Sequence, residues 1–201
     1  MLPMSDGETS KGAGTRGEGG RRDRGARTDI RADAPSAEHE TVLWVTIEIP
    51  RGSRNKYEYD DALGHFRLDR TLHSSVHYPT DYGFIPDTLA PDGDHLDVLV
   101  VVEEPTFPGC LVLARVIGLL EMQDEKGQDE KVLAVPVSDP RFHEVHELND
   151  LPSHWLREIE AFFATYKILE DKAVEVRGWH DREAAWRVIN ECRQAFNRRR
   201  T

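Results

Sequence analysis

Short apolar segments separated by turn residues recur through the middle of the chain, and they constrain the fold more than any other feature. In the first of them, residues 42–49, Val45, Ile47 and Ile49 alternate with other residues before Pro50 ends the segment. Alternation with a period of two is typical of a strand that is buried on one face. The dominant pattern therefore predicts a fold made mainly of β-strands.

Further segments continue this pattern. A turn at Asp60–Gly64 joins residues 56–60 to residues 65–70, which predicts a hairpin. The later segments have apolar middles that are too continuous for strands exposed on both faces. They are residues 96–102, 111–122 and 131–137.

Two amphipathic helices follow the strands. Pro152 opens the first, whose apolar residues recur at spacings of three and four: Trp155 or Leu156, Ile159, Phe163 and Tyr166. Asp181 is placed to cap the second, whose apolar side carries Trp186, Ile189, Cys192 and Phe196. Many short strands with helices packed outside predict an α+β, mainly β fold, a small closed barrel of the OB-like kind with flanking helices.

The composition is sufficient for one substantial core, because 38% of the 201 residues are hydrophobic and 31% are charged. We expect a single domain at residues 41–201. Residues 1–40 are rich in Gly, Arg, Ser, Asp and Ala and lack apolar periodicity, so we expect a disordered N-terminal tail there. This tail lacks the apolar stretch of a secretory signal, and it has too many acids for a transit peptide.

Charge and cysteine content limit the location and the partners. The acids and bases of residues 1–40 nearly cancel, so almost all of the net charge of -11 belongs to the predicted domain, which disfavours nucleic acid as a partner. Cys110 and Cys192 lie far apart without a partner motif, which predicts reduced thiols in a cytoplasmic protein. The sequence has no apolar run long enough to span a membrane.

The segment PDGDHLDVLV places three aspartates next to an apolar strand. Asp92 and Asp94 precede the strand, and Asp97 lies inside it. A solvated turn is one interpretation, since Asp and Gly are ordinary turn residues. The other is a cation site, because carboxylates this close repel one another unless a cation or a proton compensates them. A calcium loop of the EF-hand type does not fit, since Asp97 stands where that loop needs glycine, so Mg²⁺ is the expected ion.

A second acidic segment, MQDEKGQDEK, has Gly127 at its tip and lies between two predicted strands. Taken alone it is a hairpin loop. If both acidic segments lie at the same end of the barrel, Asp124 and Asp129 could join Asp92 and Asp97 around two or more metals. Glu48 and Glu58 could add ligands, although the sequence alone favours placing both on the solvent face of a strand.

Bases and phenols supply the other half of such a site. They are Lys56, Arg70, Tyr82, Lys131, Tyr166 and Lys167. Singly, each is explained as a surface cation or a core aromatic residue. Together with a multi-metal carboxylate cluster, they predict a pocket for a small and highly charged phosphate, which an acidic protein holds through bridging cations.

The motifs VTIEIPRGSRNKYEYD, RLDR, HYPTDYGFIPDTL, DGDHLD, MQDEKGQDEKVLAVP and FFATYKILE occur in this order between about Val42 and about Phe196. This series resembles the soluble inorganic pyrophosphatases of the magnesium-dependent family I, especially their bacterial members. The resemblance implies a five-stranded OB-like barrel with flanking helices. It also implies hydrolysis of pyrophosphate, bound as its magnesium complex, to two phosphates by in-line attack of a metal-activated water. Several Mg²⁺ ions per site, with Mn²⁺ as a possible substitute, and a cytoplasmic homohexamer are implied as well.

The resemblance also implies roles for individual residues. The metal ligands would be Glu48, Glu58, Asp92, Asp97, Asp124 and Asp129. The catalytic residues would be Asp94, which accepts the proton of the attacking water, and Asp129. Pyrophosphate would be bound by Lys56, Arg70, Tyr82, Lys131, Tyr166 and Lys167.

The sequence departs from the family pattern in the tail and at His95, where the family usually has proline. His95 is interpreted either as a solvent-facing turn residue or as an imidazole that hydrogen-bonds a ligand carboxylate or binds a softer ion. Its effect on metal preference and pH dependence stays open.

Two other classes of function fit parts of the pattern. A nucleic-acid-binding barrel would need a basic groove with exposed aromatic residues, whereas this body is acidic. A metal-dependent phosphoesterase or nuclease shares the two-metal chemistry and differs only in its substrate.

Overall fold

The computed structural model describes residues 41–125 and 127–200. The predicted N-terminal tail, residues 1–40, lies outside the described residues, so its disorder stays a prediction.

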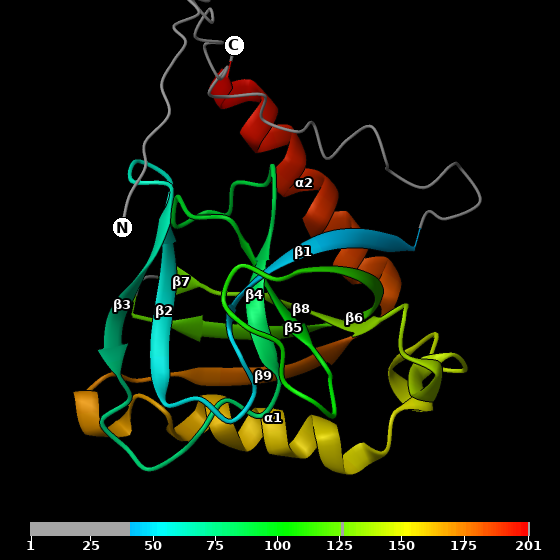
Figure 1. Cartoon of the computed structure of the whole chain (residues 1–201), viewed down its shortest axis with the longest axis horizontal. Helices are drawn as coiled ribbons and strands as arrows, with labels where there is room; N and C mark the ends of the chain where they lie inside the picture. Colours follow the sequence, from blue (N-terminus) through cyan, green and yellow to red (C-terminus); the bar gives the residue numbers. More distant parts are fainter. Residues whose placement is uncertain (1–40, 126, 201) are drawn as a thin grey trace, which may run out of the picture. The chain divides into compact units, whose positions relative to one another are not determined.

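A closed barrel forms the centre of the described structure (Figure 1). Its neighbouring strands are, in order, β1 (Val42–Ile49), β4 (Asp81–Ile85), β5 (Leu96–Val100), β8 (Lys131–Pro136) and β6 (Leu111–Asp124). Pairing of β6 with β1 closes the ring. The β5–β8 pair is parallel and the other pairs are antiparallel. The predicted five-stranded barrel in a mainly β fold is therefore confirmed.

Additional strands extend this barrel. The hairpin of β2 (Asn55–Asp60) and β3 (His65–Thr71) forms a separate two-stranded sheet, as predicted, and stands at the left of Figure 1. The short β7 (Gly127–Gln128) and β9 (Glu175–His180) both pair with β6. The pairing of β6 with β7 places the second acidic segment in a hairpin, which also agrees with the prediction.

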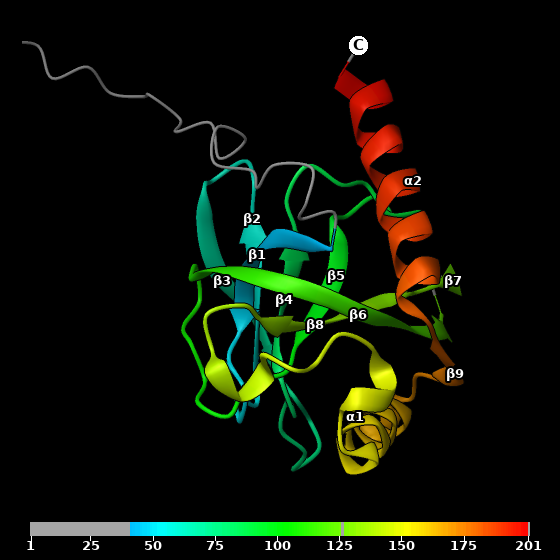
Figure 2. The ribbon, with the colours of Figure 1, turned by 90° about the vertical axis from the view of Figure 1, so that its right-hand side faces the viewer.

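Two α-helices in the described residues pack on different sides of the barrel (Figure 2). Helix α1 (Ser153–Thr165) follows Pro152 directly, and α2 (Arg182–Arg200) begins after Asp181. The predicted cap of α2 is present, since Ala184 N donates to Asp181 Oδ1 at 2.8 Å. Short 3-10 turns occupy Pro140–Phe142, Leu148–Asp150 and Ile168–Glu170.

The core consists of two apolar clusters, one under each helix. Ile159, Phe162 and Phe163 of α1 belong to the first cluster, and Ala185, Ile189 and Cys192 of α2 belong to the second. Alternate residues of β5 and β8 enter opposite clusters, so both strands are buried on both faces. This burial explains why their sequences are continuously apolar rather than alternating.

The sequence analysis did not anticipate β4 or β9. In β4, Gly83 pairs with Ile47 of β1, and a Cβ at this position would lie 2.0 Å from the carbonyl oxygen of Thr46. Glycine is thus required by the close approach of two backbones, although it disfavours a strand by propensity. The approach fixes Tyr82 and Phe84, which flank Gly83.

Candidate active site

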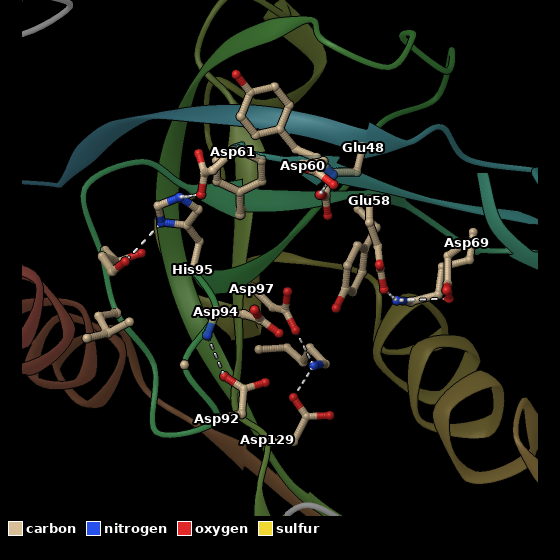
Figure 3. Close-up of a pocket in the computed structure, with 18 of the residues that line it drawn as sticks. Glu48, Glu58, Asp60, Asp61, Asp69, Asp92, Asp94, His95, Asp97 and Asp129 are labelled. Carbon is tan, nitrogen blue, oxygen red and sulfur yellow. Dashed lines mark hydrogen bonds and ion pairs between the residues drawn. The ribbon is translucent and has the colours of Figure 1, made fainter. Parts of the chain in front are cut away.

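A cavity of about 920 Å³ lies among the β2–β3 hairpin, the β4–β5 loop, the β6–β8 connection and the ends of α1 and α2. Every residue that the sequence predicted for the site lines this cavity: Glu48, Lys56, Glu58, Arg70, Tyr82, Asp92, Asp94, Asp97, Asp124, Asp129, Lys131, Tyr166 and Lys167. The fold therefore collects side chains from seven strands, from two connections and from the end of α1. Figure 3 shows several of them facing one another. The assignment of roles to these residues is still a prediction.

The aspartates of the first acidic segment occupy one side of the cavity. Asp92 and Asp94 lie on the exposed β4–β5 loop, where Asp94 N donates to Asp92 Oδ1 at 3.2 Å. Asp97 follows on β5 and is partly buried, opposite Phe84 of β4. The solvated-turn interpretation therefore fits Asp92 and Asp94 but not Asp97.

A buried lysine joins Asp97 to the second acidic segment. The ammonium of Lys131, whose side chain is 3% exposed, lies 2.5 Å from Asp97 Oδ2 and also contacts Asp129. Burial lowers the pKa of Lys131, but Asp97 and Asp129 outweigh burial and hold that pKa above its usual range. Burial and Asp97 raise the pKa of Asp129 in spite of Lys131. The single ammonium of Lys131 therefore does not fully neutralise the negative charge of these two carboxylates.

Glu48 reaches the same cavity from β1. Its Oε1 accepts a hydrogen bond from Tyr59 N at 2.7 Å, which ties β1 to the hairpin. Burial raises the pKa of Glu48 to about 7, with a further contribution from Asp97, although the bond from Tyr59 opposes the shift. Glu48 is consequently a cavity residue, and the solvent-face interpretation does not apply to it.

The hairpin contributes a charged cluster around Glu58. Glu58 contacts Lys56 through Oε1 and accepts from Arg67 Nη2 at 2.5 Å through Oε2. Lys56 also lies 3.7 Å from Asp69, and Arg70 Nη1 donates to Asp69 at 2.5 Å. Burial raises the pKa of Asp69, but Lys56 and Arg70 together lower it below its usual value.

The second cationic group stands where α1 ends. Tyr166 is the residue directly after α1, and Lys167 Nζ lies 2.7 Å from Asp124 Oδ2 and 3.2 Å from Glu125 Oε2. Burial lowers the pKa of Lys167, but Tyr166 and Asp124 outweigh burial and raise it. Burial raises the pKa of the Tyr166 phenol. Lys167 is thus held by Asp124, which the sequence had predicted for the site, and by Glu125, which it had not.

Two acids that support Arg70 were missed. Asp69 and Glu170 both bind Arg70, the latter through Nε at 3.1 Å, and the Glu170 side chain is only 7% exposed. Both lie inside motifs that the sequence analysis had singled out, RLDR and FFATYKILE. Position in a motif was thus the available signal, while the pairing with Arg70 depends on tertiary structure.

The donor set fits hard divalent cations. Within residues 41–125 and 127–200, no three His, Cys, Asp or Glu side chains converge into a closed metal cluster. The cavity nevertheless offers many carboxylate oxygens, the ligands that Mg²⁺ prefers. Burial raises the pKa of Glu48 and of Asp129, Asp97 adds to both shifts, and the neighbouring lysines offset these effects only in part.

His95 does not match the solvent-facing interpretation, and its polar contacts are with residues outside the predicted ligand set, while the binding of a softer ion stays a prediction. Its side chain is 22% exposed, so it is half-buried rather than solvent-facing. Its Nδ1 hydrogen-bonds the Thr88 carbonyl, and its Nε2 lies 3.6 Å from Asp61, which is outside the predicted ligand set.

Comparison with known proteins agrees with this geometry. The family model of inorganic pyrophosphatase matches residues 45–197. The chain belongs to the inorganic pyrophosphatase family. The resemblance read from its motifs is therefore confirmed, and the chain is assigned to the diphosphatase hydrolases.

Curated relatives of this family match most of the chain. An inorganic pyrophosphatase of Synechocystis sp. is 52% identical over 158 residues, which are 79% of this chain and 94% of the relative. That of Halalkalibacterium halodurans is 56% identical over 151 residues, or 75% of this chain and 93% of the relative. The described domain thus corresponds to nearly the whole length of these family members.

A solved member of the pyrophosphatase family has the same fold. The crystal structure of inorganic pyrophosphatase from Thermus thermophilus matches with a TM-score of 0.77 at 47% identity, covering 82% of this chain and 95% of that one. In the described part of the present chain, no helix is long and apolar enough to cross a membrane.

Proposed function

We propose that the chain hydrolyses inorganic pyrophosphate to two phosphates and requires a divalent cation, Mg²⁺ in the first place and Mn²⁺ as a substitute. The observation that carries the proposal is that carboxylates line the same cavity as a set of bases and phenols suited to binding phosphate. Family membership supports the choice of pyrophosphate over other phosphates.

The bases and phenols would bind the substrate. Arg70 and Lys167 lie in ion pairs with Glu170 and Asp124, so each is held in one position before substrate arrives. Lys56, Tyr82, Lys131 and Tyr166 would complete the set around the two phosphoryl groups. Positioned positive charge of this kind stabilises the charge that develops on a leaving phosphate.

The carboxylates would hold the cations. The ligands in this proposal are Glu48, Glu58, Asp92, Asp97, Asp124 and Asp129. Bound divalent ions supply neutralisation of phosphate charge and a lower pKa for the attacking water in an in-line displacement. Asp97 and Asp129 lie closest to Lys131, so cations there would share the compensation that one ammonium now provides.

Asp94 would accept the proton of the attacking water. It stands at the exposed rim of the carboxylate group, which gives it access to water and a route for releasing the proton. Asp129, partly buried beside Lys131, would act with it in the catalytic step.

By resemblance to the family we further infer a cytoplasmic homohexamer that takes pyrophosphate as its magnesium complex. Sedimentation equilibrium of the full chain tests the assembly: we expect six times the mass of 22.9 kDa, and a monomer at micromolar concentration contradicts this inference.

The activity is tested by phosphate release from pyrophosphate on the purified full chain, with Mg²⁺ and with EDTA in its place. We expect turnover only with the cation. ATP, single-stranded DNA and double-stranded DNA are assayed as alternative substrates. Turnover of any of them at a rate similar to that of pyrophosphate would favour a general phosphoesterase or nuclease. No phosphate release with any cation overturns the proposal. Asp139→Asn, which changes an aspartate outside the cavity, is the matched control and should keep full activity.

A further inference from the structure

The ring of His95 is held from several directions. Its Nδ1 lies 2.9 Å from the carbonyl oxygen of Thr88, and because a carbonyl only accepts, Nδ1 carries the proton. One face stacks on Phe84 with centroids 4.7 Å apart and planes 11° apart. Phe196 of α2 lies 6.1 Å from the ring at 39°. Figure 3 shows the ring beside the loop that carries Asp92 and Asp94, with Asp61 above it.

Thr88 closes the base of that loop. Its hydroxyl donates to the Ile85 carbonyl at 2.5 Å and accepts from Leu96 N at 2.9 Å, while its carbonyl accepts from His95. Thr88 is fully buried. Residues 88, 95 and 96 are thus joined, and the chain between them forms a closed loop.

Within the loop the backbone makes its own turn. Ala90 N donates to the Asp94 carbonyl at 2.8 Å, and Gly93 N donates to the Ala90 carbonyl at 3.0 Å. Asp92 and Asp94 are exposed at its tip. Because this loop carries both aspartates, their position relative to Asp97 depends on how firmly the base of the loop is fixed.

We propose that His95 is a positioning residue that fixes the loop at residues 88–95 through its Nδ1–H bond to Thr88, and so sets Asp92 and Asp94 against Asp97 for cation binding. The cation-binding part of this inference rests on the proposed function. The fixing of the loop does not, because it concerns the protein without ligands.

The contact with Asp61 contributes little. The distance from His95 Nε2 is 3.6 Å and the Asp61 side chain is 76% exposed, so the pair is screened by solvent. Asp61→Asn is therefore the matched control, and it should leave both the loop and cation binding as in the wild type.

The test compares His95→Phe with His95→Asn in the full chain. Phenylalanine keeps a ring for stacking on Phe84 but removes the donor, and asparagine carries an N–H at nearly the same position as Nδ1. Hydrogen–deuterium exchange without metal measures the loop, and a titration with Mn²⁺ followed by electron paramagnetic resonance measures cation binding.

We expect His95→Phe to speed exchange in the peptide covering residues 86–96 while β6 and β8 keep their protection. We also expect Mn²⁺ affinity to fall about tenfold, the size typical for a residue that orients metal ligands. His95→Asn should recover most of both effects. If His95→Phe does not fold, His95→Ala takes its place in the same comparison.

If hydrogen–deuterium exchange in the loop of His95→Phe is as slow as in the wild type, the inference is overturned, whatever the activity of the protein. Equal effects in His95→Phe and His95→Asn overturn the role of the hydrogen bond. A wild type that binds no Mn²⁺ and releases no phosphate contradicts the proposed function instead, and the exchange data then still decide whether His95 fixes the loop.

Discussion

Lys131 keeps its positive charge inside the protein because Asp97 and Asp129 surround its ammonium. A buried ammonium is costly to desolvate, and the carboxylates that offset the cost repel each other. Each member of the group therefore depends on the others. This dependence gives the cavity a charge balance that either a lysine or an added cation can satisfy.

Lys131→Met tests this balance. The substitution leaves Asp97 and Asp129 without their ammonium, so we expect the free energy of unfolding in EDTA to fall by about 2–3 kcal/mol. This loss is smaller than for a fully buried pair, because both aspartates are partly exposed to solvent. In Mg²⁺ the loss should be smaller, since the ion replaces part of the missing charge. Urea denaturation in the two buffers measures the difference.

Lys172→Met is the control for this comparison, because Lys172 is 42% exposed in its pair with Glu125. Its loss should stay below about 1 kcal/mol in both buffers. An equal loss for Lys131→Met in EDTA and in Mg²⁺ would show that cations do not share the role of the lysine.

Asp97→Asn tests the carboxylate that lies on β5. The amide keeps the size of the side chain and leaves Asp129 to pair with Lys131, so the fold should survive. We expect phosphate release to fall by about a hundredfold or more, since a charged group of the site is lost. Mn²⁺ affinity measured by calorimetry should fall with it, and wild-type affinity would refute the role of Asp97 as a ligand.

At the scale of elements, the barrel depends on one place where two backbones approach more closely than side chains allow. Gly83 of β4 faces the Thr46 carbonyl of β1. The strand carries Tyr82 into the cavity and the buried Asp81, which accepts from Arg51 N, Thr106 N and Thr106 Oγ1. A shift of β4 would thus move the wall of the site.

Gly83→Ala should therefore destabilise the protein by about 3 kcal/mol or more, because the added Cβ meets backbone that cannot yield. Gly118→Ala is the matched control, since its Cβ would meet side-chain atoms of Leu148, Cδ2 at 2.4 Å and Cγ at 2.6 Å, and this half-buried side chain can shift where backbone cannot. We expect a cost of about 1 kcal/mol there. Thermal unfolding of both variants measures the difference, and equal costs would contradict the backbone explanation.

The same strand shows what the sequence could not reveal. Strands with clear periodicity were predicted to within a few residues, as at β1 and β8. β4 was missed because Gly83 lowers strand propensity and its reason lies on another strand. β9 was missed because its burial is weak and Gly178 has a φ of 131°. Local pattern predicts an element only where the burial of that element repeats regularly.

The candidate site followed a similar rule. Motifs identified the residues that line the cavity, since the family resemblance carries their order along the chain. The pairing of Arg70 with Glu170, 100 positions apart, could not be predicted from spacing. Neither could the stacking of His95 on Phe84, because both depend on how distant elements pack.

At the scale of the whole molecule, all predicted site residues lie within the described part of the chain, and the barrel begins at β1. Thr41 is needed at its start, because its carbonyl accepts from Val116 N at 2.9 Å. The family model also begins after this point, at residue 45. We therefore expect residues 1–40 to form a tail that is dispensable for catalysis.

A chain that starts at Thr41, behind an initiator methionine, should keep the specificity constant for magnesium pyrophosphate within about twofold of the full chain. A second truncation, starting at Ile47, removes the residues of β1 that pair with β6 from Val42 to Thr46, and it should fail to fold because the barrel cannot close. Steady-state kinetics and circular dichroism of the two truncations measure these outcomes. A large loss in the chain that starts at Thr41, with its circular dichroism unchanged, would mean that residues 1–40 contribute to the site itself.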